Sequence, residues 1–132
     1  MLEMIKRFVN ALLVLSLAAA GIAWSAEFKE GSFTTSDGVR LHYLEAGSGK
    51  PLVMIPGWSQ TAAQFKHQLE GLSDKYRVIA LDMRGHGESD KPAHGYRIHR
   101  LSKDVYEFLA ANKLTDVVLA GHSMGCSVIW GY

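Results

Sequence analysis

The sequence predicts an α/β fold, in which a mostly parallel sheet is built from short apolar strands separated by amphipathic helices. Three short apolar runs, at residues 52–55, 76–81 and 117–120, are typical of strands buried on both faces of a sheet. Apolar residues at helical spacing occupy the intervening segments 61–74 and 98–109. A helix between two strands of one sheet returns the chain to the same end of the sheet, so these three strands are expected to run parallel, with right-handed crossovers.

An antiparallel hairpin is expected ahead of the parallel strands. Segments 30–36 and 39–46 flank Asp37-Gly38, and this dipeptide between two alternating runs is a strong hairpin signal. We expect the hairpin to be added to one edge of the sheet, with His42 facing outward from its second strand.

The composition is that of one small globular domain. The chain has 132 residues, of which 48% are hydrophobic, and its 14 Lys and Arg residues nearly balance its 13 Asp and Glu residues. This balance provides no basic field for binding nucleic acid. Cys126 is the only cysteine, which excludes an intrachain disulfide.

Residues 1–25 are predicted to be a secretory signal peptide, and residues 26–132 the folded domain. Lys6 and Arg7 precede an apolar run at residues 8–24, and Ala23-Trp24-Ser25 offers small residues for cleavage. An uncleaved membrane anchor is the alternative, because a spanning helix needs only about 17–25 apolar residues. Either segment would export the domain to the periplasm or the medium, since its positive end stays inside.

The segment Gly121-His122-Ser123-Met124-Gly125 directly follows the last apolar strand and precedes a segment that can form a helix. A serine between glycines at this spacing is typical of a tight strand-to-helix turn, which holds a nucleophile in a strained conformation and exposes its hydroxyl. The glycines are needed because the turn leaves no room for Cβ atoms on either side. The pattern therefore predicts that Ser123 is a catalytic nucleophile.

Three motifs occur in a fixed order: Pro56-Gly57-Trp58, the segment 82–89 (DMRGHGES) and the serine turn at residues 121–125. Together they resemble the α/β-hydrolase superfamily, specifically its esterase, haloperoxidase and C–C hydrolase-like branch, over residues 33–132. The resemblance implies that the backbone N–H groups of Trp58 and Met124 form the oxyanion hole for Ser123, with no cofactor or metal. Haloalkane dehalogenases and most epoxide hydrolases of this fold carry Asp in place of this serine, which argues against those two chemistries.

In the family, the catalytic acid and histidine follow the nucleophile late in the domain. Here the sequence ends nine residues after Ser123, and none of its six histidines matches the catalytic position. The resemblance therefore covers the N-terminal part of the fold, truncated after the nucleophile turn, and we expect the 132 residues alone to be inactive. Asp82 is expected to hold the loop that follows its strand, and His86 to have a structural role in that loop.

The function expected of the intact protein is hydrolysis of a small carboxylic ester or related acyl substrate, with Ser123 as nucleophile. Two alternatives are also compatible with the sequence. One is a cofactor-free haloperoxidase or C–C bond hydrolase that uses the same triad. The other is a hydrolase-like protein without a catalytic base, which acts only by binding.

Overall fold

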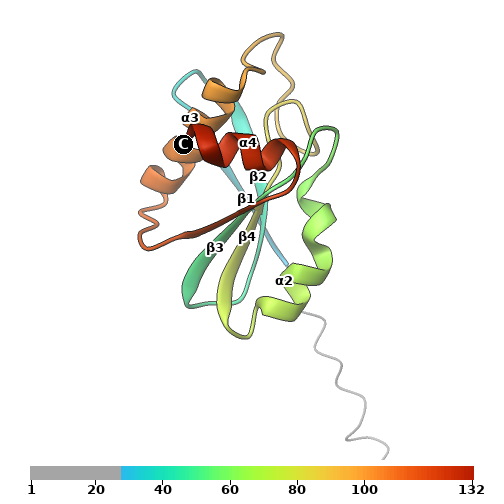
Figure 1. Cartoon of the computed structure of the whole chain (residues 1–132), viewed down its shortest axis with the longest axis vertical. Coiled ribbons are helices and arrows are strands. Elements are labelled where there is room, and N and C mark those ends of the chain that lie inside the picture. The colour runs from blue at the N-terminus through green and yellow to red at the C-terminus, as the bar shows by residue number, and fades with distance from the viewer. Residues whose placement is uncertain (1–27) are drawn as a thin grey trace, which may run out of the picture.

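The computed structural model describes residues 28–132 (Figure 1). The predicted signal peptide and its alternative, a membrane anchor, fall on residues outside this range. Within residues 28–132, no helix is both long enough and apolar enough to cross a membrane.

The order of elements is that of an α/β protein that begins with a hairpin. The elements are β1 (Lys29–Thr34), β2 (Arg40–Ala46), β3 (Lys50–Ile55), the 3-10 helix η1 (Ala62–Phe65), α2 (Lys66–Leu72), β4 (Tyr76–Leu81), α3 (Ile98–Ala111), β5 (Val118–Gly121) and α4 (Met124–Gly131). The segment expected to be one helix, 61–74, is divided between η1 and α2.

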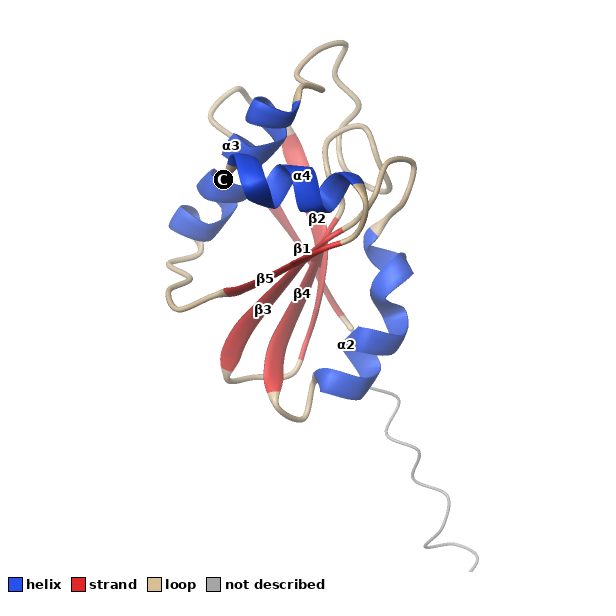
Figure 2. Ribbon diagram, viewed as in Figure 1, coloured by secondary structure: helices blue, strands red, loops and turns tan. Residues whose placement is uncertain are grey.

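The five strands form one sheet in the order β1-β2-β4-β3-β5 (Figure 2). The three predicted strands β3, β4 and β5 run parallel, with β3 in the middle. The hairpin of β1 and β2 is antiparallel and joins the sheet through β2, which pairs antiparallel with β4. The α/β fold and the hairpin at one edge are thus confirmed.

Helices cover both faces of the parallel strands. Figure 1 shows α3 and α4 on one side of the sheet and α2 on the other. Successive side chains of a strand point to opposite faces, so β3 and β4 each contribute to two separate cores. The core under α3 and α4 contains Val53, Ile55, Ile79, Leu81, Leu101, Val105, Phe108 and Val128. The core under α2 contains Leu52, Met54, Phe65, Leu69, Val78 and Ala80.

The register of the sheet places the predicted motifs at one edge. Ile55, the last residue of β3, pairs with Gly121, the last residue of β5, and Met54 pairs with Ala80 of β4. The carboxyl ends of all three parallel strands therefore meet, and the turns that follow them lie together. This edge is where ligands bind in open α/β sheets.

Candidate active site

Ser123 lies in the turn between β5 and α4, in a backbone conformation that few residues other than glycine adopt. Its φ is 52° and its ψ is −116°. A non-glycine residue held in such a sparsely populated region stores backbone strain, which persists only where the surrounding structure imposes it. The strained turn expected from the sequence is therefore present at Ser123.

The two flanking glycines are required by lack of space. A Cβ on Gly121 would lie 2.6 Å from the carbonyl carbon of Gly125 and 2.7 Å from the amide nitrogen of Cys126. A Cβ on Gly125 would overlap the carbonyl oxygen of Ile55, at the end of β3. Gly121 thus allows the turn to close on itself, and Gly125 allows the start of α4 to pack against β3.

The turn after β3 lies against Ser123. A Cβ on Gly57 would lie 3.2 Å from the Cβ of Ser123, so these two backbones are in close approach. The Gln60 N–H donates a hydrogen bond to the Gly57 carbonyl at 3.3 Å, and Ser59 has a φ of 60°. Trp58 is therefore held in a tight turn beside the serine.

Trp58 and Met124, the two residues expected to supply oxyanion donors, flank Ser123 from two separate segments. Met124 is the first residue of α4, where a helix has N–H groups without an intrahelical acceptor. Trp58 is the second residue of the turn at residues 57–60, which follows β3. Within residues 28–132, neither of these N–H groups donates a hydrogen bond to the rest of the chain.

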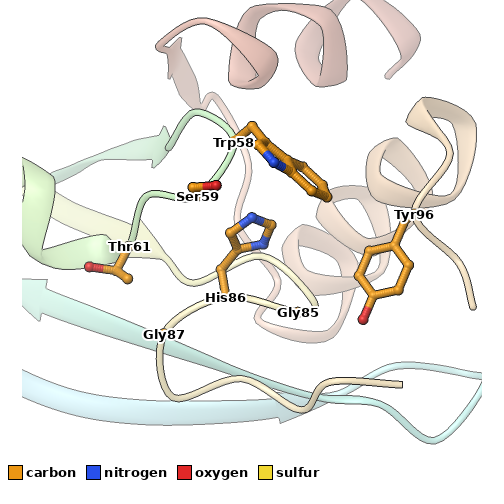
Figure 3. A pocket seen from close by; sticks show the side chains of 7 residues that line it. All are labelled: Trp58, Ser59, Thr61, Gly85, His86, Gly87 and Tyr96. Carbon is orange, nitrogen blue, oxygen red and sulfur yellow. The ribbon is translucent and has the colours of Figure 1, made fainter. Parts of the chain in front are cut away.

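A pocket of about 420 Å³ opens beside Trp58 (Figure 3). Figure 3 shows the Trp58 indole above the His86 ring, with Tyr96 across the opening. The Trp58 and His86 rings meet edge to face, with centroids 5.0 Å apart. The Nδ1–H of His86 donates to the Arg84 carbonyl at 3.0 Å, because a carbonyl oxygen can only accept. This bond fixes the orientation of the ring under Trp58.

Asp82 holds the loop that follows β4, as expected from the sequence. Its carboxylate accepts hydrogen bonds from the Ala62 N–H at 2.6 Å, from the Glu88 N–H at 3.0 Å and from Nδ1 of His42 at 2.8 Å. One buried carboxylate thus joins the start of η1 to the loop containing His86.

The prediction that His42 faces outward is wrong. His42 is buried, with 8% of its surface exposed, and it donates to Asp82. The alternation along β2 correctly separates the side chains on the two faces of the strand. However, the loop after β4 covers the face that carries the His42 side chain. In this loop, the Ser89 hydroxyl accepts a hydrogen bond from the His42 main-chain N–H at 2.8 Å.

A fully buried guanidinium, that of Arg84, anchors the same loop to α3 and to the hairpin. It forms two hydrogen bonds to Asp104, each of 2.6 Å, and two to Asp37, each of 3.1 Å. The hydrogen bond from Arg84 is the main reason that the pKa of Asp37 lies well below its usual value of 3.8. Burial would lower the pKa of Arg84, but its bonds to the two carboxylates outweigh burial and raise that pKa above its usual range.

Two further residues next to Ser123, Cys126 and His122, have side chains that form hydrogen bonds elsewhere. Cys126 is exposed, and its thiol donates to the Gly121 carbonyl at 3.1 Å. The side chain of His122 points to Gln60, with Nδ1 2.9 Å from Oε1. Among residues 28–132, no histidine is hydrogen-bonded to the Ser123 hydroxyl, and no cluster of three metal-ligating side chains occurs.

The fold and the site together define an α/β protein with a serine turn of the nucleophile-elbow type at the carboxyl edge of its parallel strands. A model of the alpha/beta hydrolase fold family matches residues 50–132. The chain belongs to this family.

The chain is similar to family members whose names describe several chemistries. It is 40% identical to epoxide hydrolase 4 of Mus musculus over 97 residues, which cover 70% of this chain and 27% of that protein. It is 41% identical to non-heme chloroperoxidase CPO-A1 of Kitasatospora aureofaciens over 93 residues, which cover 70% and 34%. The solved structure of an esterase from Exiguobacterium antarcticum has a TM-score of 0.74 and 37% identity, over 76% of this chain and 38% of that chain. The chain thus spans about a third of the length of these relatives.

Proposed function

We propose that this chain carries the nucleophile and the oxyanion hole of a serine hydrolase that acts on small carboxylic esters. The observation that carries the proposal is the strained backbone of Ser123, at a φ of 52° between two glycines that leave no space for a side chain. Strain of this kind is retained where function requires it. The N–H groups of Trp58 and Met124 are free and belong to two segments that adjoin Ser123, so they suit an oxyanion that forms when Ser123 attacks a carbonyl.

The nucleophile itself favours acyl transfer over epoxide opening. A serine that attacks an ester carbonyl forms an acyl-enzyme, which water can cleave at the same carbonyl. If serine opened an epoxide, it would become an ether, which has no carbonyl for water to attack, so the enzyme would be blocked. An aspartate nucleophile avoids this because it forms an ester intermediate. The identity to an epoxide hydrolase therefore supports the fold, while the residue at position 123 supports ester chemistry.

A catalytic base must accept the Ser123 proton, and we place it, with its acidic partner, in a part of the protein beyond these 132 residues. The family carries both after the nucleophile. The 132 residues alone are accordingly expected to be inactive. Activity is therefore to be tested in an extended form, defined as a protein that begins with these 132 residues and reaches the length of its relatives.

The test is Ser123→Ala in the extended form. We expect loss of hydrolysis of p-nitrophenyl acetate and loss of labelling by a fluorophosphonate, because both reactions need the Ser123 hydroxyl. Ser127→Ala is the matched control, since Ser127 is an exposed serine on α4, and it should retain both activities. Equal labelling of wild type and Ser123→Ala would refute the proposal.

A second candidate function is cofactor-free haloperoxidase activity with the same serine, which the identity to the chloroperoxidase favours. The two are distinguished by measuring halogenation of monochlorodimedone, in the presence of bromide, peroxide and a carboxylic acid, beside ester hydrolysis. We further propose that the domain is exported, on the basis of the apolar segment at residues 8–24.

A further inference from the structure

Gln60 closes the turn that carries Trp58. Its main-chain N–H donates to the Gly57 carbonyl at 3.3 Å, and its side-chain Oε1 accepts the Gly57 N–H at 3.3 Å. Between these residues, Ser59 has a φ of 60°, a value that few residues with a side chain adopt. The turn therefore has one defined geometry, which Gln60 fixes from both its main chain and its side chain.

The same Oε1 atom also contacts the serine turn, because it lies 2.9 Å from Nδ1 of His122. A backbone N–H can only donate, so the atom that faces Gly57 is the amide oxygen and not the amide nitrogen. An oxygen that accepts from Gly57 must also accept from His122, which places a proton on Nδ1 of His122. One side-chain oxygen thus joins the two segments that flank Ser123.

Each of these segments carries one of the two proposed oxyanion donors. Trp58 directly follows Gly57, and Met124 is two residues after His122. The strands below hold the bases of both segments, since Ile55 pairs with Gly121 and accepts the His122 N–H at 3.0 Å. Beyond the ends of the strands, the side chain of Gln60 links the two turns by hydrogen bonds that do not depend on strand pairing.

We propose that Gln60 is a positioning residue, which holds the N–H of Trp58 in register with the N–H of Met124 through its hydrogen bond to His122. This proposal rests on the proposed function of Ser123. It assigns to Gln60 a role in stabilising the transition state, although Gln60 contacts no reacting atom.

The expected effect is on turnover and not on substrate binding. Oxyanion donors act on charge that develops in the transition state, and removing one such donor entirely lowers turnover on the order of 10²–10³-fold. Without the Gln60 side chain, the turn remains closed by its main-chain bond, so the Trp58 donor is misplaced and not lost. We therefore expect a reduction in kcat on the order of tenfold with KM nearly unchanged.

The experiment compares three variants of the extended form with p-nitrophenyl acetate as substrate. Gln60→Met keeps the length of the side chain but removes the acceptor, and it should lower kcat on the order of tenfold. Gln60→Glu keeps an acceptor oxygen at the same reach, and it should stay within about threefold of wild type. Gln68→Met, at an exposed position on α2, is the matched control and should match wild type. Wild-type kcat in Gln60→Met, or equal losses in Gln60→Met and Gln60→Glu, would overturn the proposal.

A double-mutant cycle tests whether Gln60 acts through His122. If it does, combining Gln60→Met with His122→Asn should cost little more than the larger single effect, because both changes break one link. Fully additive effects would overturn the proposed path. The Ser123→Ala variant distinguishes failure of the proposed function from failure of the positioning role. If Ser123→Ala retains activity, the proposed function is refuted. If Ser123→Ala loses activity but Gln60→Met has wild-type activity, only the positioning role of Gln60 is refuted.

Discussion

Replacing Arg84 by methionine should destabilise the extended form by about 3 kcal/mol. The guanidinium of Arg84 is fully buried, and its four hydrogen bonds go to the carboxylates of Asp104 and Asp37. Methionine fills much of the same volume, so the main consequence is the loss of charge and donors and not a cavity.

The magnitude follows from what remains around Asp104. Removing one partner of a buried ion pair costs about 3–5 kcal/mol, because the other charge stays buried without compensation. Asp104 has no exposed surface, but it keeps a second partner, since Arg100 Nη2 lies 2.7 Å from its Oδ1. This remaining pair places the expected cost at the lower end of that range. Losing the bonds to Asp37 adds less, because Asp37 is partly exposed and keeps Arg100 Nη2 at 3.0 Å.

The assay is urea unfolding of the extended form followed by circular dichroism, with Arg97→Met as control. Arg97 is an exposed arginine next to α3, so its replacement should change the free energy of unfolding by less than about 0.5 kcal/mol. The double variant Arg84→Met/Asp104→Leu should be more stable than Arg84→Met, because it removes the buried charge as well as its partner. An Arg84→Met variant as stable as the control, or a double variant less stable than Arg84→Met, would contradict the proposed contribution of Arg84 to stability.

Three further predictions concern the serine turn, acid stability and export. Gly125→Val should abolish fluorophosphonate labelling of the extended form, because its side chain would overlap the Ile55 carbonyl and displace the turn; labelling at the wild-type rate would contradict this. The pKa of Asp37 is lower in the folded state than its usual 3.8, so its contribution to stability is complete above that pH and is lost as the pH falls below it. Asp37→Asn should therefore lose less unfolding free energy than wild type between pH 5 and pH 3, as measured by urea unfolding at each pH. Expressed in a bacterium, the protein should be found outside the cytoplasm, shortened by roughly 25 residues; an exported form that still begins at Met1 on N-terminal sequencing would favour the anchor.

From the sequence alone we could predict the mostly parallel sheet, the hairpin at its edge and the position of the serine turn. Strands β3 and β4 must be apolar on both faces because helices cover both faces. This requirement appears in the sequence as short runs of consecutive apolar residues. The turn at Ser123 could be predicted because its geometry excludes side chains at Gly121 and Gly125, and a glycine requirement is visible in a sequence.

Which polar side chains are buried, and what they bind, depends on contacts between segments that are distant in the sequence. His42 lies 40 residues from its partner Asp82, Arg84 is 47 residues from Asp37, and Gln60 is 62 residues from His122. The alternation along a strand shows which residues share a face, but it does not show which distant loop will cover that face, and this is why the prediction for His42 was wrong. Apolar burial leaves a local pattern because many neighbours of one kind satisfy it, whereas a buried hydrogen bond depends on a single partner that only the folded chain brings within reach.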